Sequence, residues 1–114
     1  MGYDTHLADR INQILKSKNI AYHEKKMMGG LTFMVHDKMC LGIIKENLMI
    51  RVDPEIQEEL LRKAGCIMMD FTKRPMKGYL YVEPLAVDMV EELEKWIQYA
   101  LDFNPKAKSS KKKK

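Results

Sequence analysis

Cysteine is scarce in this sequence, and long hydrophobic runs are missing from it. Cys40 and Cys66 are its two cysteines, too few for a disulfide scaffold, and the N-terminus lacks the apolar core of a secretory signal. We therefore expect two reduced thiols in a cytoplasmic protein. No apolar run approaches the ~18 residues that a membrane-spanning helix needs, which predicts that the protein does not span or contact a membrane.

Catalytic and phosphate-binding motifs are absent as well. The sequence has no P-loop, GxGxxG, GxSxG or HExxH pattern, and acidic pairs such as Glu91-Glu92 fall on the polar side of an amphipathic helix, which predicts a solvated surface. His23, His36 and Cys40 could form a metal site only if the fold brings them together, because their spacing in the sequence matches no ligand pattern. We predict that the protein is not an enzyme and holds neither a cofactor nor a metal.

Basic charge is concentrated at one end of the chain. The 114 residues carry a net charge of +4, yet residues 106–114, KAKSSKKKK, contain six of the twenty basic residues and no acid. Without this segment, fourteen basic residues face sixteen acidic ones, so the folded part is slightly acidic. The length and an apolar fraction of 46% predict one domain at 1–105, followed by a disordered Lys-rich tail at 106–114.

Hydrophobic periodicity predicts helices at both ends of the domain and strands between them. Asp4 and Asp53-Pro54 are signals for helix N-termini, and Gly65 is a suitable residue just after the middle helix. Helices are expected at about 5–18, 54–64 and 86–103, and strands at about 20–27, 31–35, 38–44, 48–52, 66–69 and 79–82. The order α-β-β-β-β-α-β-β-α predicts an α+β fold in which an antiparallel sheet packs with helices.

The stretch 26–52, KMMGGLTFMVHDKMCLGIIKENLMIRV, is the most regular part of the pattern. It predicts three strands joined by turns at HDK and KEN. Gly29-Gly30 at its entrance favours a turn with a positive φ or a bulge, and a phosphate-binding loop is the weaker alternative. Both faces of the first two strands are largely apolar, so helices or a partner are expected to cover both.

A basic loop, Lys73-Arg74-Pro75-Met76-Lys77, is the second segment of interest. Its cations surround a rigid proline and precede two tyrosines, a composition suited to phosphate contacts and base stacking, although a solvated loop is the simpler interpretation. The candidate contact surface consists of Arg51, Lys73, Arg74 and Lys77.

Two separated motifs together resemble the N-terminal domain of the TfoX/Sxy family. The residues that carry the resemblance are Lys26, Met27, Gly29, Gly30, Lys38, Met39, Leu48, Arg51, Pro75, Met76, Lys77 and Gly78. The similarity runs from about Tyr3 to Phe103. It implies a two-layer domain with an antiparallel sheet, close to the fold of type III secretion chaperones.

The resemblance also implies a function. Members of the family are bacterial regulators of DNA-uptake competence that act on transcription through partner proteins. We therefore expect a non-enzymatic regulatory or protein-interaction domain whose partner is an unidentified protein, such as a transcription regulator, and which pairs as a homodimer as secretion chaperones do. The alternative is direct, weak nucleic-acid binding through the KRPMK loop and the Lys tail.

Overall fold

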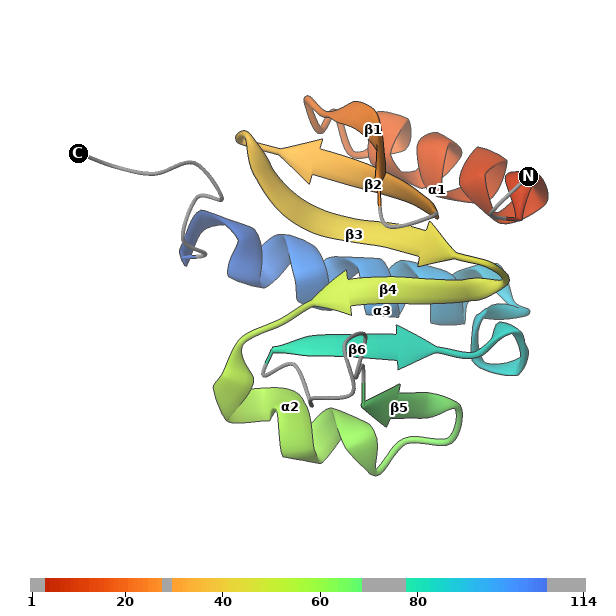
Figure 1. Ribbon diagram of the computed structural model, residues 1–114, viewed down its shortest axis with the longest axis vertical. Coiled ribbons are helices and arrows are strands. Elements are labelled where there is room, and N and C mark those ends of the chain that lie inside the picture. The colour runs from red at the N-terminus through yellow and green to blue at the C-terminus, as the bar shows by residue number, and fades with distance from the viewer. Residues whose placement is uncertain (1–3, 28–29, 69–77, 107–114) are drawn as a thin grey trace.

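The computed structural model describes residues 4–27, 30–68 and 78–106 (Figure 1). The elements in chain order are α1 (Thr5–Ser17), β1 (His23–Met27), β2 (Gly30–Val35), β3 (Lys38–Ile44), β4 (Asn47–Arg51), α2 (Pro54–Leu61), β5 (Cys66–Met68), β6 (Tyr79–Val82), η1 (Pro84–Val87), α3 (Val90–Phe103) and η2 (Asn104–Lys106), where η marks a 3₁₀ helix. The α+β class and the predicted order of helices and strands are confirmed. The predicted tail begins at Lys106, and its remaining residues lie outside the described part of the chain.

Six strands form one open sheet in the order β1-β2-β3-β4-β6-β5, and every neighbouring pair is antiparallel. The first four strands follow one another as a meander, whereas β6 lies between β4 and β5. Figure 1 shows α1 running along β1 and β2, and α3 crossing behind β3 and β4. Within the described residues, none of the helices has the length and apolar character needed to cross a bilayer.

One face of the sheet provides most of the hydrophobic core. Leu31 pairs with Ile43, Ile43 with Leu48, and Leu48 with Val82, so these side chains form a row across four strands. All four are at most 4% exposed. The residues of the helices that join this same core are Leu7, Ala8, Ile11, Ile14 and Leu15 of α1, Leu60 of α2, and Leu93, Trp96, Ile97 and Ala100 of α3. The three helices therefore cover a single face, which makes the two layers that the resemblance implies. Within the described residues helices do not cover both faces, although Thr32 and Met49 at the alternate positions of β2 and β4 are also buried, each 1% exposed.

The first helix begins where the sequence predicts. The Asp4 carboxylate accepts hydrogen bonds from the amides of His6 (2.9 Å) and Leu7 (3.2 Å), so it satisfies two amides that have no partner within the helix. The predicted stripe of Leu7, Ile11, Ile14 and Leu15 is buried. A salt bridge of 3.2 Å between Lys18 and Glu94 then links the end of α1 to α3.

The middle helix is capped and anchored by polar side chains. Asp53 accepts a hydrogen bond from the amide of Glu55 (2.9 Å), and Pro54 occupies the first turn, as predicted. The buried Gln57 then accepts a bond from the Gly78 amide (3.0 Å) and donates to the Met68 sulfur (3.0 Å). These two bonds hold α2 against β5 and the start of β6.

Gly65 does not have the predicted place directly after this helix. The helix ends at Leu61, and Gly65 follows in a separate turn with a φ of +86°. The Gly65 carbonyl accepts a bond from the Glu83 amide (2.8 Å), and a Cβ at this position would lie 2.6 Å from the Cβ of Ala86. Glycine is needed here because of its backbone angle and because another segment packs against it.

The last helix is also shorter than predicted. Pro84–Val87 forms a 3₁₀ helix, the chain is extended at Met89, and α3 begins at Val90. Leu93 and Ile97 are buried as expected, but Val90, predicted on the same inner face, is 54% exposed. The predicted first strand likewise starts late, at His23, because the Ile20 amide still bonds to the Leu15 carbonyl of α1.

The turn between β2 and β3 contains two residues with positive φ, His36 (57°) and Asp37 (60°). A two-residue hairpin with positive φ at both positions has the handedness that matches the twist of the strands. The buried Asn104, which follows α3, donates to the Val35 carbonyl (3.0 Å), and its Oδ1 lies 2.7 Å from Nδ1 of His36. Lys38 donates to the carbonyls of Asn104 and Pro105, both at 3.3 Å. The C-terminal end of α3 is thereby fastened to the β2–β3 hairpin.

The reason for Gly30 differs from the predicted turn with a positive φ or bulge. Gly29 lies outside the described residues, and Gly30 is the first residue of β2, without a positive φ. A Cβ built on Gly30 would lie only 2.0 Å from the carbonyl oxygen of Ile43 on β3. Close approach of two strand backbones therefore requires a residue without a side chain here.

We expect Gly30→Ala to lower the free energy of unfolding by about 3 kcal/mol, because β2 and β3 must separate to admit the methyl group. Urea unfolding of the wild type and the variant measures this difference in the free energy of unfolding. Gln13→Ala, an exposed change on α1, is the control and should stay within about 0.5 kcal/mol of the wild type. A Gly30→Ala protein as stable as this control would contradict the close-approach explanation.

Candidate functional site

Arg51 is the one predicted contact residue within the described part of the chain; Lys73, Arg74 and Lys77 lie outside it. Arg51 ends β4 and pairs with Tyr79 of β6. Its guanidinium carbon lies 5.5 Å from the ring centroid of Tyr79 and 5.9 Å from that of Phe103 on α3. The side chain is half-buried. These cation–π contacts join two strands to α3, and a contact with a partner stays a prediction.

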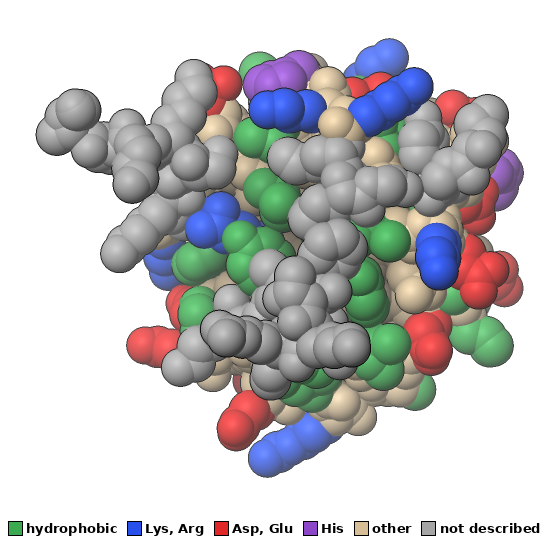
Figure 2. Space-filling model, in the orientation of Figure 1, with side chains coloured by type: hydrophobic (Ala, Val, Ile, Leu, Met, Phe, Trp, Pro, Cys, Tyr) green, Lys and Arg blue, Asp and Glu red, His purple; other side chains and the backbone are tan. Residues whose placement is uncertain are grey.

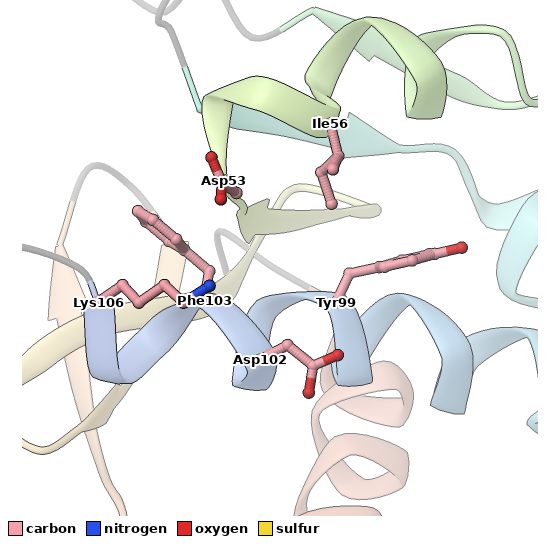
Figure 3. Close-up of a pocket in the computed structure, with 6 residues that line it drawn as sticks. All are labelled: Asp53, Ile56, Tyr99, Asp102, Phe103 and Lys106. Carbon is pink, nitrogen blue, oxygen red and sulfur yellow. The ribbon is translucent and has the colours of Figure 1, made fainter.

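A small pocket lies beside this cluster, between the start of α2 and the end of α3 (Figure 3). Its volume is about 180 Å³, and its lining consists of Asp53, Ile56, Tyr99, Asp102, Phe103 and Lys106. Both carboxylates already serve the fold: Asp53 caps α2, and Asp102 accepts a bond of 2.8 Å from Gln98. Figure 3 shows Asp102 turned away from α2. The pocket is smaller than the ~300 Å³ at which ligand sites usually begin.

The two cysteines are buried in the core. Burial raises the pKa of the Cys40 thiol to about 12, with a smaller opposing effect of the nearby Arg51 charge. Burial likewise raises the pKa of Cys66 to about 11, opposed in part by Lys63. A nucleophilic cysteine needs a lowered pKa and access to its substrate, and these thiols have neither.

The histidines are spread over the surface of the fold. His6 and His23 are exposed, and His36 is bonded to Asn104. Among residues 4–27, 30–68 and 78–106, no three His, Cys, Asp or Glu side chains are grouped so that they could hold a metal ion. The described residues thus give no support to the His23, His36 and Cys40 alternative.

A surface feature that sequence analysis missed lies at the start of α3. Leu85, Met89 and Val90 are 79%, 62% and 54% exposed, the three highest values among the large exposed hydrophobic residues of the described chain. We call the segment from Glu83 to Glu92 the 83–92 surface. Periodicity gives no sign of this exposure, because Met89 and Val90 both lie at helical spacing from the buried Leu93 and Ile97. Pro84 is a local signal that the chain changes conformation before α3.

Acidic side chains accompany these apolar residues. The 83–92 surface contains Glu83, Asp88, Glu91 and Glu92, all exposed, and no basic residue. Figure 2 shows hydrophobic and acidic side chains next to one another at the edge of the molecule where Figure 1 places η1 and the start of α3. The exposed large apolar side chains and the charged side chains of residues 83–92 are thus close together in the sequence, and all of these charges are negative.

Comparison with known proteins adds one finding. A family model described as TfoX N-terminal domain matches residues 16–104. The match includes all six strands, α2, the Arg51 cluster and the 83–92 surface. Neither the comparison with curated proteins nor that with solved structures gave a match.

The raised pKa of Cys40 predicts how stability depends on pH. Its thiol ionises near pH ~8.5 in the unfolded chain but near 12 in the folded one, so its stabilising effect is complete below pH ~8.5 and lost as pH rises toward 12. We expect the stability difference between wild type and Cys40→Ala to shrink by about 1.4 kcal/mol per pH unit above pH ~8.5. Urea unfolding over a pH series measures it.

Cys66→Ala provides the matched comparison. The pKa of Cys66 is raised to about 11, so the same trend should end at a lower pH than it does for Cys40. A stability difference that is independent of pH for Cys40→Ala would show that the buried thiol ionises as readily in the folded protein as in the unfolded one.

Proposed function

The chain belongs to the TfoX N-terminal domain family, and from this premise we propose that it is a regulatory domain that acts by binding another protein. The family predicted from the sequence is thus confirmed, and the regulatory role is our proposal. The expected partner is a protein that controls transcription, as the resemblance to competence regulators implies.

Two features support a binding role over a catalytic one. The family is not known as a catalytic domain. In addition, the groups that could do chemistry serve the structure: Asp53 caps a helix, and Cys40 lies in the core with a raised pKa. A site for general acid–base or nucleophilic catalysis needs accessible groups that face a substrate.

The observation that carries the proposal is the exposure of Leu85, Met89 and Val90 next to one another. Single exposed apolar residues are common, but a contiguous group with a polar rim is typical of an interaction site. Arg51 and the basic residues Lys73, Arg74 and Lys77 remain a second candidate contact surface on this protein.

Affinity capture from the native cytoplasm, with and without nuclease, tests the proposed function. We expect the full chain to retain at least one protein in the same amount after nuclease treatment, because a direct protein contact needs no nucleic-acid bridge. Beads without the immobilised protein are the control. If every retained protein were released by nuclease, the protein-binding function would be wrong.

The Lys-rich tail favours a second candidate function, weak binding of nucleic acid. Residues 106–114 contain six lysines and no acid, and each phosphate neutralised by a lysine releases counterions. Deletion of these residues should weaken DNA or RNA binding at low salt and flatten its dependence on salt concentration, measured by fluorescence anisotropy. If the intact chain binds neither nucleic acid at low salt, this second function fails.

A further inference from the structure

We infer that the 83–92 surface binds a segment of a partner protein in which apolar side chains are flanked by lysines or arginines. This inference rests on the proposed function and adds to it the place of contact and the chemistry of the partner.

The apolar component of the surface is a continuation of the core that nothing in the described structure covers. Val90 precedes Leu93 and Ile97 at helical spacing, so all three lie along one stripe of α3. Leu93 and Ile97 are completely buried, whereas Val90 is 54% exposed. The stripe therefore runs beyond the sheet, where Met89 and Leu85 widen it. Covering these side chains would be favourable, since burial of apolar area drives most protein association.

The surface is held in place before any partner arrives. The Ala86 amide donates to the Glu83 carbonyl (2.9 Å), and the Trp96 indole donates to the Ala86 carbonyl (3.2 Å). Arg10 of α1 donates to the Asp88 carbonyl (3.2 Å). One backbone hydrogen bond and two side-chain bonds to backbone carbonyls thus fix η1 and the start of α3. A surface with this preformed shape loses little conformational entropy on binding.

The charge around the apolar residues selects the partner. Glu83, Asp88, Glu91 and Glu92 are all acidic. Among the nearby cations, Lys18 pairs with Glu94, Arg10 donates to the Asp88 carbonyl, and Lys95 lies one helical turn after Glu91. The four acids therefore outnumber Arg10 and Lys95, and the surface keeps an excess of negative charge. Like charges brought together across an interface are costly, so this surface disfavours a second copy of itself, nucleic acid and anionic lipid. It favours a segment with Lys or Arg beside apolar side chains.

The position of two of these acids at the start of α3 also favours a basic partner. Glu91 and Glu92 occupy the first turn of α3, where their charges complement the helix dipole. Their negative charges are therefore favourable in the folded protein. Because both side chains are exposed, a basic side chain of the partner can pair with them without disturbing the fold.

A fluorescein-labelled helical peptide of Leu and Lys at helical spacing serves as the probe, and the same peptide with Glu in place of Lys is its control. Fluorescence anisotropy measures binding to the full chain. We expect Leu85→Ser/Met89→Ser to weaken binding about tenfold, equivalent to 1.4 kcal/mol. Glu91→Gln/Glu92→Gln should weaken binding and reduce its dependence on salt. The Glu peptide should bind more weakly than the Lys peptide.

Glu58→Gln/Glu59→Gln is the matched control. These exposed acids lie on α2, and the substitution changes the net charge by the same amount as the Glu91 and Glu92 variant does. It should leave the peptide affinity within about twofold of the wild type if the contact is local. Urea unfolding of all variants separates a lost contact from a lost fold. Amide shifts in a two-dimensional NMR spectrum should change for residues 83–92 upon addition of the Lys peptide.

Three results of the peptide experiments would overturn the inference. They are equal binding by the Leu85→Ser/Met89→Ser protein, equal losses of affinity in the Glu58/Glu59 and Glu91/Glu92 variants, and amide shifts centred on Tyr79 and Phe103. A dimer that dissociates in the Leu85→Ser/Met89→Ser variant would identify a second copy as the occupant and overturn it too. If capture retains a protein partner that this variant binds equally well, the proposed function stands and the site is wrong. If capture retains none while the peptide maps to 83–92, the site stands without the function.

Discussion

The fold depends on the need to cover one apolar face of a sheet. The row Leu31–Ile43–Leu48–Val82 and its neighbours would otherwise face water, and three helices from separate parts of the chain lie over them. Burial of this face is the main favourable contribution to stability, so each helix must begin and end at residues that let it cover the apolar side chains of the sheet. The ends of the helices are fixed by hydrogen bonds of four polar side chains: Asp4, Asp53, Gln57 and Asn104.

Sequence reasoning recovered the parts of the fold that local chemistry determines. Alternation gave the strands, N-cap acids gave the first turns of α1 and α2, and periodicity gave the buried stripe of α3. It did not recover features set by distant segments. Gly30 is needed because Ile43 is close, and Gly65 packs against Ala86. The turn at HDK was predicted, but its support by Asn104, 68 positions from His36, became known only through the fold.

The candidate sites also combine features that the local sequence predicts with features that depend on distant segments. Arg51 could be selected from its sequence motif, but its two aromatic neighbours come from β6 and α3 and became known only through the fold. The 83–92 surface was not predicted because the expected helix begins at about residue 86, before the true start of α3 at Val90, which places Val90 on its buried face. Exposure depends on where the sheet ends, and sequence periodicity carries no information about that position.

The Asn104 contact also has a consequence for the order in which the protein is completed during synthesis. Asn104 reaches back to Val35 and His36, so the β2–β3 hairpin is translated well before the residue that fastens α3 to it. At about 5–20 residues per second, the ribosome adds the intervening segment over several seconds. During that interval the nascent sheet has α1 but not α3. The last fastening of the β2–β3 hairpin is therefore made late, once Asn104 is free to bond to Val35 and His36.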